Sequence, residues 1–238
     1  MLQINHLIRR YYNRAAVDDV TLTLDSGKTY ALLGPNGSGK TTLMKMIAGL
    51  VKPTSGEILL DNEPIGVRSK AKIAYMPTEN YFYSHMTIRD AGRYYADFFS
   101  DFSLEQYNAS LTRMDLEPKD KIRQLSSGMA AKLRLALTLS RDAELMMFDE
   151  PLNGVDILTR QQVVDEILRC RETGRTMLLS THLVDELEPS IDCAIYMLHG
   201  KIALMGDRDV LAERGTLTEL YLKIYGTEGI DHVQAVKG

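Results

Sequence analysis

The residues best suited to chemistry in this chain form a glycine-rich run early in the sequence. Gly34 is followed, after four positions, by Gly39, Lys40 and Thr41. This spacing is typical of a phosphate-binding loop, because glycines let backbone N–H groups turn toward phosphate oxygens while a lysine adds positive charge. The alternative is a glycine turn with a lysine there by chance. The residues that we expect to bind phosphate are Asn36, Gly37, Ser38, Gly39, Lys40, Thr41 and Thr42.

A pair of adjacent carboxylates, Asp149 and Glu150, follows the apolar run 145–148. Because neighbouring strand residues point to opposite sides, one carboxylate can hold a metal ion while the other activates a water molecule. We assign Asp149, with the Thr41 hydroxyl, to Mg²⁺ and Glu150 to the catalytic base. Alone, the run is better explained as a strand that ends in solvated acids, because acids after strands are common. Together with the phosphate-binding loop, it predicts phosphoryl transfer.

The apolar pattern predicts an α/β fold that positions these residues. Apolar residues at a three-four spacing between 40 and 50 predict a helix directly after the glycine loop. A second helix is predicted at 161–172, between strand-like runs, and this alternation favours a parallel sheet flanked by helices. The first two runs are separated by turn residues and predict antiparallel strands. The strand-like runs are residues 2–7, 20–24, 30–33, 145–148, 176–180 and 193–198.

The residue pattern changes in the segment of about 86–139, which is helix-like and rich in aromatic and aliphatic residues. We therefore expect an inserted helical lobe there. The core is then about 1–85 and 140–238, and the whole chain, 1–238, is one domain.

Composition excludes several classes of protein. The chain has 238 residues, 45% of them hydrophobic, and a formal net charge of −4. These values are ordinary for a globular protein, and the absence of a long basic run argues against a nucleic-acid partner. No apolar run reaches the roughly 20 residues of a spanning helix. With only two cysteines, Cys170 and Cys193, and no signal peptide, we expect a reducing cytosolic setting.

Residues 125–129, which read LSSGM, resemble the signature sequence of ATP-binding cassette (ABC) proteins. The phosphate-binding loop and the carboxylate pair occur in the order that this family has. Asp156 ends a segment similar to the family's aspartate loop, and His182 matches its switch histidine. The resemblance covers nearly the whole chain. It implies a P-loop NTPase (RecA-like) core with a parallel sheet, an amino-terminal antiparallel β subdomain and an inserted α-helical subdomain.

The resemblance also implies roles for residues outside the first two motifs. Ser126 and the Gly128 backbone would reach the γ-phosphate of ATP bound to a second copy, so that two subunits close around two nucleotides. His182 would contact the γ-phosphate and the attacking water. Tyr11 would stack on adenine, with Tyr12 as its rival. Without the resemblance, His182 fits a structural role and both tyrosines fit ordinary strand-edge aromatics.

Two segments depart from the family pattern. The family usually has two glycines and a glutamine in the signature, whereas this chain has Ser127 and Met129. The family's glutamine loop is expected after Pro77, where residues 78–80 read TEN without a glutamine. The Thr78 hydroxyl and Glu79 carboxylate fit either an approach to magnesium through water or a plain surface turn. We assign neither residue to the site.

The resemblance implies an ATPase that dimerises, as a homodimer or heterodimer, and works with an integral membrane permease. We expect it to be cytoplasmic and peripheral on the inner face of the cell membrane. The aromatic segment 78–89 fits a docking site for the permease, or equally residues that seat the lobe on the core. The signature, residues 77–80 and a short carboxyl tail favour export.

Two other functions fit the sequence less well. A soluble cassette ATPase that acts on nucleic acid or ribosomes would normally show long coiled-coil heptads or two cassettes in one chain. A phosphate-loop kinase would leave the signature, the aspartate loop and the switch histidine unexplained. The ATP-driven transporter subunit accounts for more of the sequence than either.

Overall fold

The computed structural model describes residues 1–79, 81–182 and 184–235, and the chain divides into two compact units. The first unit consists of Met1–Pro64 and Ser180–Gly238, and the second of Ile65–Leu179. Asn80, the last residue of the segment that departs from the glutamine loop, lies outside the described residues.

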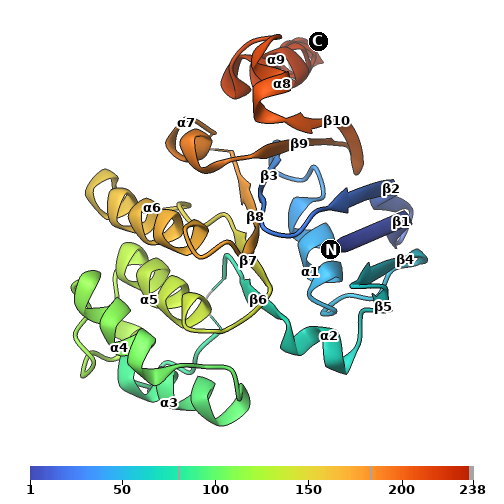
Figure 1. Ribbon diagram of the computed structural model, residues 1–238. Helices are drawn as coiled ribbons and strands as arrows, with labels where there is room; N and C mark the ends of the chain where they lie inside the picture. Colours follow the sequence, from blue (N-terminus) through green and yellow to red (C-terminus); the bar gives the residue numbers. More distant parts are fainter. Residues whose placement is uncertain (80, 183, 236–238) are drawn as a thin grey trace. The chain divides into compact units, whose positions relative to one another are not determined.

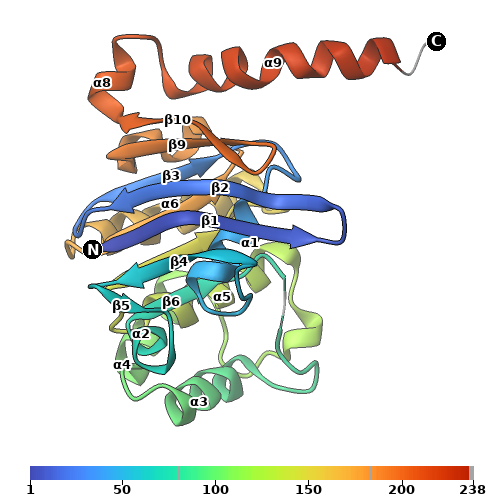
Figure 2. The ribbon, with the colours of Figure 1, turned by 90° about the vertical axis from the view of Figure 1, so that its right-hand side faces the viewer.

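The amino-terminal part of the first unit is a four-stranded antiparallel sheet with the order β2-β1-β4-β5. In β2, Val20, Leu22 and Leu24 are buried while the threonines between them are exposed, so one face of the strand packs on the interior. This confirms the expected antiparallel subdomain (Figure 2). Its strands are β1 (Leu2–Tyr11), β2 (Arg14–Leu24), β4 (Ser55–Leu60) and β5 (Glu63–Pro64).

The first unit also contains the strand that leads into the glycine loop. All five residues of β3 (Thr29–Leu33) are buried, and β3 pairs in parallel with β9 (Cys193–Leu198). β9 in turn pairs antiparallel with β10 (Lys201–Asp207). The predicted parallel sheet thus has one antiparallel strand at this edge. The reason is the tight turn at His199 and Gly200, both with positive φ, which can join only antiparallel strands.

Helix α1 (Lys40–Ile47) follows the glycine loop, as predicted, and buries Leu43, Met44, Met46 and Ile47. It ends three residues before the predicted Leu50, because Gly49 takes a left-handed conformation (φ 67°) that terminates the helix. The remaining helical segments of the first unit are α7 (Val184–Leu187), the 3-10 turn η2 (Glu188–Ser190), α8 (Arg208–Ala212) and α9 (Leu217–Ala235).

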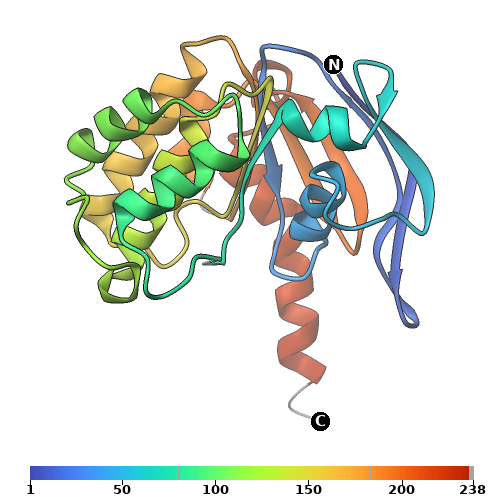
Figure 3. The same ribbon diagram turned by 90° about the horizontal axis from the view of Figure 1, so that it is seen from below.

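The second unit places helices beside strands in the order β8-β7-β6. β6 and β7 pair in parallel, with Met76 opposite Phe148, and the first four residues of β8 belong to this unit. Helices α3, α4 and α5 fall within the predicted lobe (Figures 1 and 3). The strands are β6 (Ile73–Met76), β7 (Leu145–Asp149) and β8 (Thr176–Thr181). The helical segments are α2 (Val67–Ala71), α3 (Ile88–Phe98), α4 (Leu104–Arg113), the 3-10 turn η1 (Ile122–Gln124), α5 (Ser127–Leu139) and α6 (Ile157–Arg171).

Side-chain caps explain where the helices of the second unit begin. Thr87 and Asp90 form a reciprocal capping box at the start of α3, and the hydrogen bonds that Thr87 donates lower the pKa of Asp90. Asp156 caps α6, so that helix begins at Ile157, four residues before the predicted start at 161. No helix in the described part of the chain is long and apolar enough to cross a membrane.

Helix α3 packs closely on α4 through a glycine. A Cβ atom at Gly92 would lie 2.2 Å from the ring of Tyr107. That ring has little room to move, because Tyr107 is only 1% exposed and its hydroxyl donates to the Ile88 carbonyl oxygen at 2.7 Å. Gly226 in α9 offers a contrast, since a Cβ there would meet no atom within 4 Å.

We predict opposite effects of alanine at these two helical glycines. Gly92→Ala should lower the free energy of unfolding by about 1–3 kcal/mol, because overpacking outweighs the gain in helix propensity. Gly226→Ala should leave it unchanged or raise it by up to about 1 kcal/mol. Urea denaturation followed by circular dichroism measures both, and equal stability of the two variants would contradict the packing argument.

Candidate functional site

The glycine loop joins the end of β3 to the start of α1, as the sequence predicts. Gly39 is the residue before the helix and has φ 109°, a conformation that side chains strongly disfavour. A Cβ there would lie 2.2 Å from the Ala16 carbonyl oxygen, and one at Gly34 would lie 2.5 Å from the Met197 carbonyl oxygen. Only glycine therefore fits at either end of the loop. The N–H groups of the first helical turn form an anion site of the kind found at helix N-termini.

The Lys40 ammonium group lies within this loop. Its Nζ atom donates to the Gly34 carbonyl oxygen at 2.7 Å and to the Pro35 carbonyl oxygen at 3.3 Å, and the residue is only 5% exposed. A buried ammonium group needs compensation, which these carbonyl dipoles supply in part. A phosphate group would offer full negative charge at the same place.

Ser38 gives independent support for an anion in the loop. The residue is buried, and its Oγ atom has no hydrogen-bond partner among the described residues. A buried hydroxyl without a partner costs about 1–3 kcal/mol, a cost that a bound phosphate oxygen would remove. Thr41 and Thr42 are half-buried in the first turn of α1, and Asn36 and Gly37 are exposed. The loop residues named from the sequence thus lie in the loop and in the first turn of α1.

Tyr11 and Tyr12 lie at the end of the hairpin formed by β1 and β2. Tyr11 is the last residue of β1, is 41% exposed and has the Arg9 guanidinium 4.5 Å from its ring centroid. Tyr12 is fully exposed and takes φ 52° in the turn. Tyr11 therefore presents a ring held by a neighbouring side chain, which suits stacking better than the exposed ring of Tyr12.

In the second unit, Asp149 ends β7 and is completely buried. Its Oδ2 atom accepts a hydrogen bond from the Tyr75 hydroxyl at 3.0 Å, and its backbone carbonyl oxygen accepts one from Thr78 Oγ1 at 3.0 Å. Burial, and next the charge of Asp149, raise the pKa of Tyr75, so its hydroxyl stays protonated and acts as a donor.

Sequence reasoning gave no role to Tyr75 and assigned Thr78 to neither the site nor the metal. Tyr75 donates to the carboxylate that we assigned to Mg²⁺, and Thr78 donates to the backbone carbonyl oxygen of the same residue. Tyr75 carried a usable signal, because it is the one polar side chain in the short apolar run Ile73–Met76. Thr78 carried none, because its contact depends on the backbone path after β6.

Glu150 lies just beyond the end of β7 and is 8% exposed. Its φ is 50°, and its carbonyl oxygen accepts the Asn153 N–H at 3.1 Å. We expected the two side chains to point to opposite sides because both residues were predicted to be in one strand. This reason was wrong, because the strand ends at Asp149 and Glu150 lies in a left-handed turn. Such a conformation costs a non-glycine residue about 1–3 kcal/mol and is concentrated at functional sites.

The signature segment begins helix α5. Ser126 is exposed and caps the helix by accepting the Met129 N–H at 3.2 Å. Gly128 is buried, and a Cβ there would lie 3.3 Å from Asp156 Oδ2. Asp156 itself caps α6 by accepting the Thr159 N–H at 3.1 Å. Within the second unit, the signature and the aspartate loop thus lie together.

The predicted site residues divide between the two units. The phosphate-binding loop, Tyr11 and His182 belong to the first unit, where His182 follows β8 and is exposed. The second unit contains Asp149, Glu150, Ser126, Gly128 and Asp156.

Comparison with known proteins identifies the family. The ABC transporter family model matches residues 17–153, which is more than half of the chain. A solved structure described as the ATP binding subunit of an ABC transporter has a TM-score of 0.83 and 26% identity, and the match covers 94% of this chain and 98% of that one. This confirms the expected cassette fold.

Curated relatives agree with the family model. The lantibiotic transport ATP-binding protein SrtF of Streptococcus pyogenes is 32% identical over 88% of this chain and 92% of its own length. A Nod factor export ATP-binding protein I of Sinorhizobium fredii is 27% identical over 94% of this chain and 68% of its own length. An uncharacterized ABC transporter ATP-binding protein of Synechocystis is 32% identical over 79% of this chain, which spans 55% of that relative's length.

The family model, these relatives and the geometry of the glycine loop support one conclusion. The chain belongs to the ABC transporter family, and it is an ATP-binding, ATP-hydrolysing member of that family.

Proposed function

We propose that this ATPase is the motor subunit of a bacterial exporter and that it works as a dimer on a separate integral membrane permease. The observation that carries the proposal is the phosphate-binding loop with its enclosed ammonium group, in a chain that spans 92% of a lantibiotic transport ATP-binding protein. The similarity to a Nod factor export ATP-binding protein also favours export.

The proposed reaction assigns one task to each group of residues. The loop amides, Lys40 and Ser38 bind the β- and γ-phosphates of ATP. Glu150 accepts a proton from a water molecule while the oxygen of that water bonds to the γ-phosphorus. At the same time, the bond between the γ-phosphorus and the ADP oxygen breaks. His182 donates a hydrogen bond to the γ-phosphate and orients the water. Tyr11 stacks on the adenine ring.

The residues proposed for magnesium fit that ion. Mg²⁺ prefers oxygen ligands and is usually held by one or two carboxylates together with substrate phosphates. Thr41 supplies a hydroxyl in the first turn of α1, and Asp149 supplies a buried carboxylate that Tyr75 orients. When bound, the ion would neutralise charge on the phosphates.

Dimerisation would complete the site with a second copy of the chain. Ser126 and Gly128 lie at the N-terminus of α5, where unpaired N–H groups and the helix dipole favour a negative ligand. We propose that they bind the γ-phosphate of the ATP held by the partner copy. Hydrolysis removes this charge bridge, and the dimer then opens.

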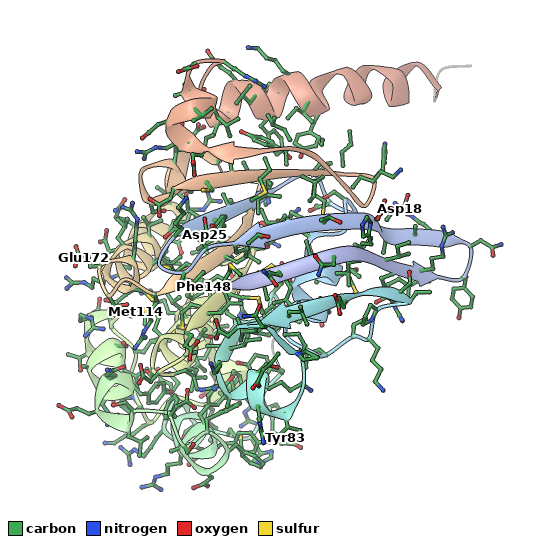
Figure 4. The ribbon with its side chains drawn as sticks, turned by 45° about the vertical axis from the view of Figure 1, so that its right-hand side comes forward. Asp18, Asp25, Tyr83, Met114, Phe148 and Glu172 are labelled. Atoms are coloured by element: carbon green, nitrogen blue, oxygen red, sulfur yellow. The ribbon has the colours of Figure 1, made fainter. Side chains whose placement is uncertain are left out.

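An aromatic surface at residues 81–86 is the proposed docking site for the permease. Tyr81 and Tyr83 are 44% and 63% exposed, and the Tyr83 ring stacks on His85 with centroids 5.7 Å apart. Figure 4 shows the side chain of Tyr83. Exposed aromatic rings of this kind are enriched in protein interfaces. Docking there would hold the chain at the cytoplasmic face of the membrane.

Affinity purification from detergent-solubilised membranes tests the transporter assignment. We expect an integral membrane protein to be recovered with the tagged chain, and recovery to fall when Tyr81 and Tyr83 are both changed to Ser. Recovery of ribosomes or DNA instead would favour the soluble cassette ATPase and overturn the proposal.

Lys40→Ala should weaken ATP binding by about 10- to 100-fold, because a charged hydrogen-bond donor is lost from the phosphate site. Lys45→Ala, which removes a lysine from the last turn of the same helix, is the matched control and should bind ATP normally. Titration with a fluorescent ATP analogue gives both affinities. Normal ATP affinity of Lys40→Ala would exclude a role for Lys40 in binding phosphate.

Glu150→Gln should retain ATP binding but lose at least about 100-fold in turnover, since the base is removed while the phosphate contacts remain. It should also accumulate an ATP-bound dimer, visible by size-exclusion chromatography. Glu144→Gln, at an exposed position paired with Lys72 just before the same strand, is the control. Unchanged phosphate release by Glu150→Gln would refute the base assignment.

A further inference from the structure

A tyrosine in the carboxyl-terminal helix contacts the backbone that carries the phosphate-binding loop. Tyr225 in α9 is buried, and its hydroxyl lies 3.1 Å from both the Leu33 and the Met197 carbonyl oxygens. These carbonyls belong to β3 and β9, which are paired in parallel. Helix α9 runs beside β10 and β9 in the first unit (Figure 2). The single hydroxyl proton is therefore shared between two neighbouring strands.

Both carbonyl groups adjoin the glycines of the loop. Leu33 directly precedes Gly34, and the Met197 carbonyl oxygen is the atom that a Cβ at Gly34 would approach to 2.5 Å. The Met197 Cε atom would lie 2.7 Å from a Cβ at Gly39, at the other end of the loop. Met197 thus touches the loop at both ends, and Tyr225 holds the backbone of Met197.

Tyr225 is itself fixed by its surroundings. Its ring packs against Tyr221 and Tyr196, with centroids 4.4 Å and 6.5 Å away. The start of α9 is anchored because Tyr196 donates to the Leu217 carbonyl oxygen at 2.9 Å, and Thr218 hydrogen-bonds to Asp185. A hydroxyl held this firmly can define the position of the carbonyls that it contacts.

We propose that Tyr225 is a positioning residue for ATP binding, because its hydroxyl keeps the strand ends at Leu33 and Met197 in the arrangement that shapes the phosphate-binding loop. It touches no reacting atom. The carboxyl-terminal helix thereby becomes part of the nucleotide site. The inference rests on ATP binding by this loop, and it extends that function to a segment outside residues 17–153 that the family model matches.

The physical reason is preorganisation. A loop that is already held in its bound shape loses less conformational freedom when the ligand binds, so affinity rises without a new contact to the ligand. Removing the hydroxyl would loosen the loop before ATP arrives. The effect should appear in the affinity for ATP rather than in the rate of the chemical step.

Tyr225→Phe tests the inference, with Tyr107→Phe as the matched control. Each change removes one buried hydroxyl that donates to the backbone and keeps the ring, but the Tyr107 hydroxyl donates to the Ile88 carbonyl oxygen in the second unit and not to the strand ends beside the loop. We expect Tyr225→Phe to raise the Kd and KM for ATP about 3- to 10-fold, with kcat at saturating ATP within about twofold of the wild type. Tyr107→Phe should lower the Tm and leave the Kd unchanged.

Hydrogen exchange of the unliganded protein gives a second measurement that does not depend on activity. The amides of Gly34 and of residues 36–39 should exchange faster in Tyr225→Phe than in Tyr107→Phe. Equal Kd values and equal exchange in the two variants would overturn the inference and reduce Tyr225 to a packing residue. If the wild type itself does not bind ATP, the proposed nucleotide site fails before Tyr225 is tested.

Discussion

The close approach of two backbone segments to the glycine loop is the constraint on which the nucleotide site depends. The Ala16 and Met197 carbonyl oxygens lie where a side chain at Gly39 or Gly34 would have to be. The loop is therefore shaped by β2 and β9 as well as by its own sequence. A cradle of backbone N–H groups needs this crowding, because an unsupported glycine loop would sample many conformations and bind phosphate weakly.

In the second unit, the constraint is a carboxylate that is buried away from water and needs hydrogen-bond partners. Asp149 is completely buried, and Tyr75 and Thr78 supply hydrogen bonds to its carboxylate and its backbone. A buried carboxylate with hydrogen-bond partners keeps its orientation. Glu150 is set apart from Asp149 by a left-handed turn rather than by strand alternation. The two acids thus have different surroundings, which the different roles proposed for them require.

Sequence predicted most of this fold because the informative signals were local. The buried strand before Gly34, the helix after Lys40 and the apolar strand before Asp149 each follow from a pattern of a few residues. Features that depend on backbone path were missed, such as the contact of Thr78 with Asp149. The antiparallel β10 was also missed, although residues 202–205 read IALM and follow the turn at His199 and Gly200.

The contacts of α9 show why sequence motifs miss residues that support a binding loop from a distant part of the chain. Tyr225 is 192 residues from Leu33 in sequence, and nothing in its local pattern distinguishes it from an ordinary buried tyrosine. Its relevance arises only when β3 and β9 pair and bring two carbonyl groups within reach of one hydroxyl. A glycine-rich loop has few side chains with which to hold its own shape. The groups that hold it must therefore come from neighbouring elements, and in this chain one of them comes from the carboxyl-terminal helix.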